Sequence, residues 1–321
     1  MVADVARAPV VEWLLESHEP AIRRLVRRNL LDERSDHENV LSGRIVKGLL
    51  DGQEANGGFG GHAYNKWVGA HWRLISLVEM GVPAGEPRAV AAADTVLAWL
   101  TGTSHRRNVP VIEGLARRCG SQEGNALAVA SRLGLATTDP RVAQLAESLV
   151  GWQWPDGGWN CDRKPGAHRS SFNETLGPIW GLHEYATATG DPDARAAGRR
   201  GAELLLEHHV FRALATGAPM HDEWLVMHWP PFWHYEILNA MVVLARLGLA
   251  ADPRAADAVD VIVARRQTNG RWRASSRWWK PPPMATRGSE AVDWRIDDSG
   301  DRMVTLRALT VLRAAGRSLS H

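Results

Sequence analysis

The chain has 321 residues, of which 45% are hydrophobic and 23% are charged, and this composition excludes an intrinsically disordered protein. Its 38 basic and 36 acidic residues are scattered along the chain, so no basic stripe indicates a nucleic-acid partner. No apolar run reaches the roughly 18 residues of a membrane span. Two cysteines cannot form a disulfide framework, and the N-terminus carries acids on both sides of its short apolar run, unlike a secretion signal. We therefore expect a globular, reduced, cytoplasmic protein with no integral membrane segment.

Helix signals then follow one another along the chain. The apolar pattern predicts N-terminal helices within residues 1–35, from about Val10 to Leu31, and paired helices within residues 40–315. The second helix of each pair is the more apolar one and ends at a glycine, as helices capped by a left-handed residue do. These second helices are expected at residues 71–81, 125–134, 174–190, 235–248 and 303–316. Strand signals are almost absent.

The paired helices are copies of one unit. The string RLGLATTDPR at 132–141 leads to WQWPDGGW, and RLGLAADPR at 246–254 leads to RRQTNGRW, with 21 residues from the opening arginine to Gln153 or Gln267. Prolines that open the first helices recur 53, 52 and 61 residues apart, at Pro87, Pro140, Pro192 and Pro253. Such a period is typical of paired-helix repeats. We predict a single all-α domain over residues 1–321, an α/α toroid in which outer and inner helices alternate around a barrel.

The turn that follows each outer helix carries a family resemblance. The string from Gln153 to Trp159, with its Pro-Asp-Gly-Gly turn, resembles the Gln-Trp repeat of squalene and oxidosqualene cyclases, in which Gln and Trp fasten an outer helix to its neighbour. Similar strings run from Gln53 to Phe59 and from Gln267 to Trp272. The resemblance covers residues 40–315 and points to the terpenoid cyclase and protein prenyltransferase superfamily. It implies the toroid fold and, less specifically, a cyclase-like lyase or isomerase of secondary metabolism, because a fold does not carry a chemistry.

The acid motifs of these relatives are matched only loosely. Class II cyclases carry a DxDD motif, which is absent from this chain. The string DWRIDDSGD at 293–301 matches the DDxxD pattern of class I terpene synthases, but Ser299 and Gly300 interrupt it just before the last helix. We expect its acids, Asp293, Asp297, Asp298 and Asp301, to lie in a solvated loop with a helix N-cap.

A zinc site is a second implication of the resemblance. Protein prenyltransferase β chains hold zinc with an Asp-x-Cys pair and a later histidine. Here Cys161 stands beside Asp162 in the reverse order, and His221, His228 and His234 follow. If a metal is bound, Cys161, Asp162 and His221 are its expected ligands.

Polar and aromatic residues gather in the connections that enter the more apolar helices. These connections occupy the same place in their repeats, and in a toroid such loops open on one end of the central cavity, so we expect them to converge. The 15 tryptophans suit an aromatic wall for that cavity. The candidate substrate-binding residues are His62, Tyr64, Lys66, Trp67, His71, Glu123, Asn125, Trp224, Trp229 and Trp233. Each of them, taken alone, is more often a cap or a packed core residue than part of a site.

The candidate catalytic residues are Asp162, Glu174, His228 and His234. We expect an enzyme that acts on a hydrophobic or aromatic small molecule, an isoprenoid or polycyclic metabolite, by acid-base cyclisation, isomerisation or elimination in the central cavity. Asp162 or Glu174 would be the acid and His228 or His234 the base, with no cofactor. Two alternatives stay open: a zinc-dependent hydrolase or transferase, and a non-catalytic binding scaffold. The sequence leaves the substrate and the oligomeric state open.

Overall fold

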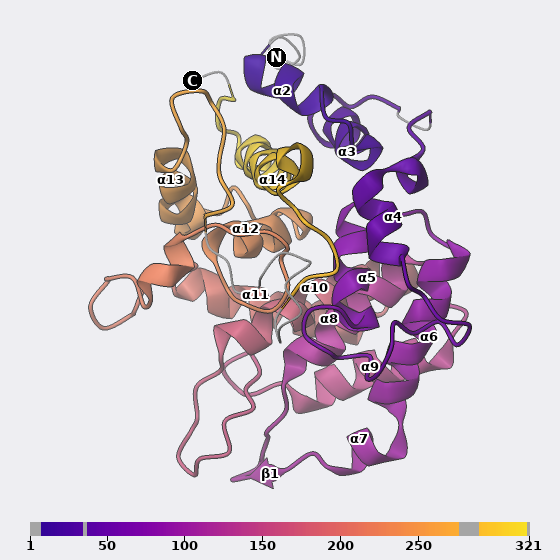
Figure 1. The fold of residues 1–321 in the computed structure, drawn as a ribbon. Helices are drawn as coiled ribbons and strands as arrows, with labels where there is room; N and C mark the ends of the chain where they lie inside the picture. Colours follow the sequence, from indigo (N-terminus) through magenta and orange to yellow (C-terminus); the bar gives the residue numbers. More distant parts are fainter. Residues whose placement is uncertain (1–7, 35–36, 276–288, 320–321) are drawn as a thin grey trace.

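The computed structural model describes residues 8–34, 37–275 and 289–319. Helices make up most of the regular structure in these ranges (Figure 1), which confirms the all-α prediction. The strands in these ranges are β1 (Val111–Ile112) and β2 (Leu115–Ala116), which pair antiparallel with Val111 opposite Ala116. The N-terminal helices are α2 (Pro9–Leu15) and α3 (Pro20–Leu30), as the apolar pattern predicts.

A set of helices lies inside the molecule, with side chains buried on nearly every side. In α5 (Ala70–Glu79), for example, every residue except Arg73 is buried. The other members are α8 (Gly120–Arg132), α10 (Phe172–Thr189), α12 (Ile237–Arg246) and α14 (Ser299–Ala314). They correspond to the five second helices predicted from the sequence. Each is followed by a glycine with positive φ, a conformation that costs glycine little, at Gly81, Gly134, Gly190, Gly248 and Gly316.

A second set of helices buries one face and exposes the other. It consists of α4 (Arg44–Leu50), α6 (Pro87–Thr101), α9 (Pro140–Trp152), α11 (Pro192–Glu207) and α13 (Ala256–Ala264). Three of them begin with a proline directly after an acidic N-cap whose side chain accepts a backbone N–H, at Glu86, Asp139 and Asp191. The fourth predicted proline, Pro253, opens the short 3-10 helix η3 (Pro253–Ala255) that leads into α13.

The buried helices pack in chain order, α5 on α8, α8 on α10, α10 on α12 and α12 on α14, and α14 packs on α3. Helices α8 and α10 approach most closely, because Gly124 leaves room for the backbone at Gly177 and Pro178. A methyl group on Gly124 would collide with that backbone. This close approach brings the connections before α8 and α10 together.

Glutamine and tryptophan fasten the helices as the resemblance implies. The side-chain amide of Gln153 donates to the carbonyl of Gly157 at 2.6 Å and to that of Ala197 in α11 at 2.8 Å. Gln53 repeats this pattern toward Gly57 and Arg88 of α6, at 3.0 and 2.8 Å. The outer helix that precedes the turn is therefore tied to the next outer helix.

Two buried tryptophans complete the fastening. Trp159 and Trp272 are 1% and 0% exposed, and their indole N–H groups donate to the carbonyls of Leu149 and Ile262 at 2.9 and 2.7 Å. The third copy departs from the prediction. Arg266, rather than the exposed Gln267, bonds the turn carbonyl, that of Gly270, at 3.1 Å.

The acids of the 293–301 string form hydrogen bonds and ion pairs, and the expected solvated loop is present only in part, because Asp297 and Asp298 lie in the short 3-10 helix η4 (Ile296–Asp298) and Asp301 lies in the first turn of α14. The Asp297 carboxylate accepts from the Ser17 hydroxyl at 2.7 Å and from the His18 N–H at 2.8 Å. Asp293 pairs with Arg295, and Asp301 accepts the N–H of Ala274 at 2.8 Å. Asp298 occupies the N-cap position of α14, but its side chain forms no capping bond.

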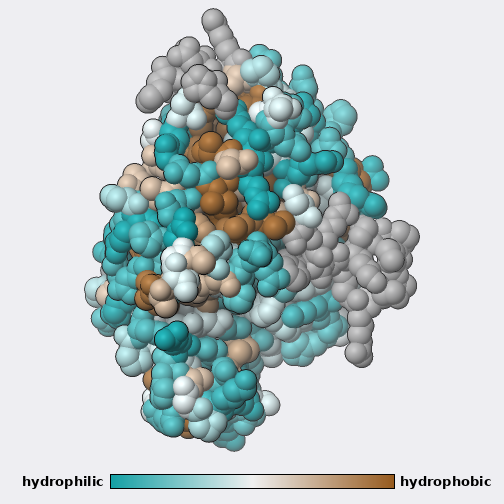
Figure 2. All heavy atoms as spheres, turned by 90° about the vertical axis from the view of Figure 1, so that its left-hand side faces the viewer, coloured by the Kyte–Doolittle hydropathy of each residue, from teal (hydrophilic) through white to brown (hydrophobic). Residues whose placement is uncertain are grey.

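The surface is mostly hydrophilic on the face drawn in Figure 2, with an apolar strip in its upper half. Exposed large apolar side chains include Val263 of α13, which is 43% exposed, and Leu214, which is 67% exposed. In the described parts of the chain, no helix combines the length and the apolar character that crossing a membrane requires.

Candidate functional site

Two thiols and a buried carboxylate meet where the connections enter α8 and α10. Cys119 directly precedes α8, Cys161 lies in the loop before α10, and Glu174 lies in the first turn of α10. One potential ligand atom of each lies within 4.8 Å of the others. Among the described residues, these three side chains form a group whose ligand atoms are close enough together to hold a metal ion.

The Glu174 carboxylate is 4% exposed and surrounded by donors. Its Oε2 accepts from the Ser121 N–H at 3.1 Å and from the Ser121 hydroxyl at 2.7 Å. Its Oε1 accepts from the Trp233 indole N–H at 3.2 Å and faces the Cys161 thiol at 3.9 Å. Burial raises the pKa of Glu174, and the bonds from Ser121 and Trp233 offset only part of that effect.

The two thiols differ in acidity. Both cysteines are free and half-buried. A hydrogen bond between them raises the pKa of Cys119 and lowers the pKa of Cys161. Cys161 is therefore the side chain of the pair that ionises first.

Aromatic rings pack beside this cluster. Trp67 stacks on Phe232 with centroids 5.1 Å apart, and Trp233 meets His234 at 4.4 Å. The Lys66 ammonium lies 5.0 Å from the Trp67 ring and 4.9 Å from the Trp233 ring. The ring faces near Glu174 thus already hold one positive charge, as aromatic faces favour.

Other predicted substrate-binding residues extend the same wall. Tyr64 packs against both His71 and Trp72, at 5.4 and 5.0 Å, and His62 lies edge-on to Trp99 at 4.9 Å. His71 is 2% exposed, and burial lowers its pKa to about 3, so its ring is neutral near pH 7.

Glu123 and Asn125 have structural bonds near this wall. The Glu123 carboxylate accepts from His105 at 2.8 Å and from Arg118 at 3.1 Å. The Asn125 amide donates to the carbonyl of Phe232 at 3.3 Å and so holds the 226–236 segment against α8.

The two candidate bases lie side by side, with ring centroids 6.5 Å apart. Burial lowers the pKa of His228 to about 3, and burial together with the charge of Lys66 lowers that of His234 to about 4. Both rings are neutral near pH 7. Because a base works best with a pKa near the working pH, neither histidine is well tuned for the role that the sequence suggested.

The remaining predicted residues have their contacts elsewhere. The Asp162 carboxylate accepts the N–H of Lys164 at 3.0 Å within its own exposed loop. Trp224 stacks on Phe172 at 5.0 Å, and His221 packs on Trp224 at 4.8 Å. The resemblance suggested Cys161, Asp162 and His221 as metal ligands. Of these three, Cys161 belongs to the group formed with Cys119 and Glu174, and Asp162 and His221 lie outside that group.

Trp229 belongs to a different environment again. Its ring meets that of Trp294 edge-on at 5.5 Å and lies 5.4 Å from the Arg307 guanidinium. It therefore stands beside the arginine cluster described below, rather than beside the thiols.

Neither the protein-family models nor the curated proteins include a match to this chain.

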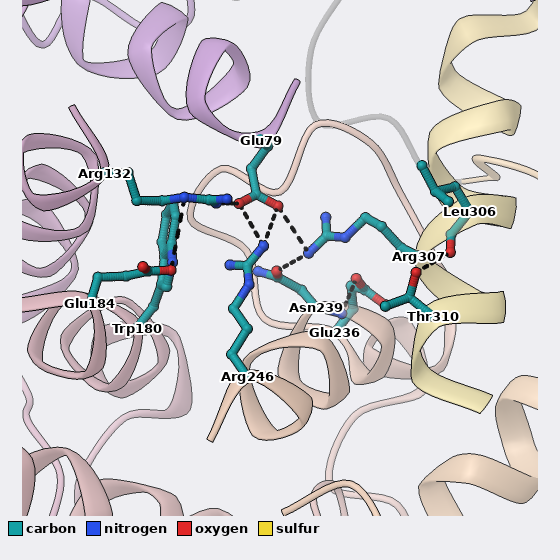
Figure 3. Close-up of polar contacts among 10 residues, drawn as sticks. All are labelled: Glu79, Arg132, Trp180, Glu184, Glu236, Asn239, Arg246, Leu306, Arg307 and Thr310. Atoms are coloured by element: carbon teal, nitrogen blue, oxygen red, sulfur yellow. Dashed lines mark hydrogen bonds and ion pairs between the residues drawn. The ribbon is translucent and has the colours of Figure 1, made fainter. Parts of the chain in front are cut away.

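Two features were missed from the sequence. Cys119 was one; its position directly before a buried helix could have indicated it. The other is a charged cluster around Glu79, drawn in Figure 3. Glu79, Arg132 and Arg246 each stand two residues before the glycine that caps a buried helix. That shared register places them at one level of the helix assembly.

Proposed function

We propose that this protein is an enzyme that acts on an apolar or aromatic small molecule at the Glu174 cluster. One observation carries the proposal: a buried carboxylate with a raised pKa, in contact with a thiol and an indole N–H, lies beside a wall of aromatic rings. A raised pKa lets such a carboxyl group keep its proton at a higher pH than an exposed one, so that it can donate the proton and take it back. Cyclisation, isomerisation and elimination all need this step.

Glu174 takes the acid-base role in this proposal. Ser121 fixes one carboxylate oxygen with two hydrogen bonds, which leaves Oε1 to exchange the proton. Trp233 donates to that same oxygen and stabilises its charge once the proton has left. His228 and His234 remain neutral parts of the wall, because their lowered pKa values disfavour protonation.

The adjoining cavity sets a condition on substrate entry. Ser121, Asn125 and Trp233 help to line a space of about 20 Å³, which holds a single water but no metabolite. A substrate must therefore displace Phe232, which also lines it, while Trp233 keeps its bond to Glu174. Both belong to the 226–236 segment, and their ring faces suit an apolar or cationic ligand.

We also propose that the helices close into an α/α toroid, as the terpenoid cyclase and prenyltransferase resemblance implies. The buried helices contact one another in series from α5 to α14, and α14 reaches α3. Gly81, at the end of α5, lies beside Leu25 of α3, so the series returns to its start. The polar connections before α8, α10 and α12 then share one end of the ring.

A zinc-dependent hydrolase or transferase is the second candidate, favoured by the grouping of Cys119, Cys161 and Glu174. Two thiolates and a carboxylate form a ligand set that zinc accepts, with a fourth position left for water or substrate. Ser121 would orient the carboxylate from outside the ligand set, as partners of metal-bound carboxylates do. Zinc bound there would supply a Lewis acid.

Metal analysis of protein purified without chelator separates the two candidates. One zinc per chain, lost in Cys119→Ser and Cys161→Ser but kept in the control variants Asp162→Asn and His221→Ala, would establish the second candidate and eliminate the first in its simple form. Absence of zinc from folded wild-type protein leaves the first. Native mass spectrometry of the same preparation then tests the first: a co-purified apolar compound that is lost in Trp233→Ala supports it. Retention of that compound in Trp233→Ala would place its binding elsewhere.

A further inference from the structure

The charged cluster around Glu79 lies at the opposite end of the buried helices from the thiols. Figure 3 shows the guanidinium groups of Arg132, Arg246 and Arg307 converging on the Glu79 carboxylate. The shortest contacts are 2.8 Å from Arg132 and 2.7 Å from Arg246, and Arg307 lies at 4.0 Å. Arg132 stands eleven residues after Ser121 on α8, roughly 16 Å along the helix. The small space beside Ser121 and Trp233 is also lined by Glu79 and Arg246, so it lies between the two clusters.

A cavity of about 370 Å³ opens beside this cluster. It is much larger than the space next to Glu174 and falls within the size range of small-molecule sites. Apolar side chains such as Leu25, Val242 and Met303 form part of its wall. The cavity can therefore hold a ligand that has an apolar part as well as a charged one.

The charges that line the cavity do not balance. Four arginines face it, Arg28, Arg132, Arg246 and Arg307, against two carboxylates, Glu79 and Glu184. Burial lowers the pKa of His183, which also lines the cavity, so this ring adds no charge near pH 7. The lining thus carries a formal surplus of two positive charges.

The surplus rests on Arg28 and Arg307. Arg28 bonds the side chain of its neighbour Asn29 at 3.0 Å, and in the described ranges no carboxylate forms an ion pair with it. Arg307 is 6% exposed and donates to Asn239 at 2.6 Å, yet its Nε–H has no hydrogen-bond partner among the described residues. Buried donors without partners are rare in folded proteins.

Helix termini account for part of this pattern. Arg132 and Arg246 lie in the last turns of α8 and α12, where the helix dipole favours a cation. The same effect applies to Arg28 in the last turn of α3, but it does not require the arginines to converge, and it does not explain Arg307 in the middle of α14. Four guanidinium groups around one cavity match the forked recognition of an oxyanion.

We propose that this cavity binds a small molecule carrying a dianionic phosphate-monoester group, whose two charges match the surplus. The phosphate would lie between Arg28 and Arg307, and the apolar wall would contact the organic part. This inference does not rest on the proposed function of the Glu174 cluster.

Calorimetric titration of the full-length protein at pH 8 and constant ionic strength tests the proposal. The probes are inorganic phosphate, phenyl phosphate and, as a monoanion control, acetate. Phosphate should bind saturably while acetate does not. Tighter binding of phenyl phosphate than of phosphate would show that the site takes organic phosphates; equal or weaker binding would limit it to the free ion and refute the organic part of the proposal.

Matched variants locate the binding. Arg28→Gln should weaken phosphate affinity by roughly 10-fold or more, as loss of a charge-assisted bond does. Arg27→Gln makes the same charge change one residue earlier, on the side facing Glu38, and should weaken it by less than about 2-fold, because a screened surface charge contributes little. Thr310→Asp, which places a carboxylate in the lining, should abolish binding. No saturable phosphate binding by the wild type, or equal losses in Arg27→Gln and Arg28→Gln, would overturn the proposal.

Discussion

The indole nitrogen of Trp233 lies 3.2 Å from a carboxylate oxygen of Glu174, 59 residues away in the chain, and donates a hydrogen bond to it. This bond lowers the pKa of Glu174 against the larger, opposite effect of burial. Trp233 therefore adjusts the acidity of the group to which we assign proton transfer.

Replacing Trp233 with Phe should move the titration of Glu174 upward, because the donor that favours the carboxylate is lost. The pH profile of turnover, or of ligand affinity, should shift to higher pH relative to the wild type. Trp229→Phe is the control, since among the described residues the Trp229 indole N–H makes no hydrogen bond. Identical profiles for all three proteins would show that Glu174 does not govern the step.

Trp159 and Trp272 should be stability residues. Replacing either with Ala removes a fully buried ring and an indole hydrogen bond, and should cost roughly 3 to 5 kcal/mol in the free energy of unfolding. Urea denaturation measures this cost. Trp159→Phe keeps most of the ring and should lose less than Trp159→Ala; equal losses would mean that packing of the ring contributes little.

Alanine substitution of the side chains that bond the repeat turns should change stability by different amounts. Gln153→Ala removes two donated bonds and should cost about 1 kcal/mol or more, whereas Gln267→Ala should scarcely change stability because its side chain is exposed. Arg266→Ala should resemble Gln153→Ala, since Arg266 bonds Gly270 and Leu319 at 3.1 and 3.0 Å. A larger loss in Gln267→Ala than in Arg266→Ala would contradict this assignment.

Glu236 should make stability depend on pH near neutrality. Burial raises its pKa from 4.5 to about 7, although Arg307 and two backbone N–H groups of α12 favour the charged form. Because the folded pKa is the higher one, the stability contributed by protonated Glu236 is complete below pH 4.5 and is lost as the pH rises through 7.

The Glu236→Gln variant isolates this effect. Between pH 5 and pH 8, wild-type stability should fall relative to the variant by on the order of 2 to 3 kcal/mol. Urea titrations of both proteins at several pH values measure the difference, in which the contributions of the buried histidines cancel. A difference that stays constant with pH would show that Glu236 titrates normally.

The helices could be predicted because their signals are local. Proline after an acidic cap opens an outer helix, and a glycine with positive φ, such as Gly134 or Gly248, ends a buried one. Burial of Trp159 and Trp272 also followed from the repeat. That Arg266 rather than Gln267 bonds the turn carbonyl could not be predicted, because either side chain can reach that carbonyl. The choice depends on the packing around Leu319, whose carbonyl Arg266 also bonds.

Part of the Glu174 cluster could be predicted from the sequence. Glu174 stood out as an acid at the start of an apolar helix, and the structure places it at the centre of the cluster. Its partners depend on how closely α8 approaches α10. Gly124 and Gly177 allow this close approach, but the sequence alone does not show that the two helices pack at these glycines. For the same reason Asp162, adjacent to Cys161 in sequence, lies outside the cluster, while Cys119 lies inside it.

Proton transfer by Glu174 is tested most directly by incubating an apolar metabolite extract of the source cells with wild-type protein and with Glu174→Gln, followed by liquid chromatography and mass spectrometry. The variant keeps the shape of the side chain and removes its proton exchange. Wild-type protein should convert at least one compound, seen as a retention shift at constant mass for a cyclisation or isomerisation, or as a loss of mass for an elimination. Folded Glu174→Gln protein should form that product roughly 100-fold more slowly or worse. Equal conversion by the two proteins, or no compound altered by the wild type, would contradict a catalytic role for Glu174.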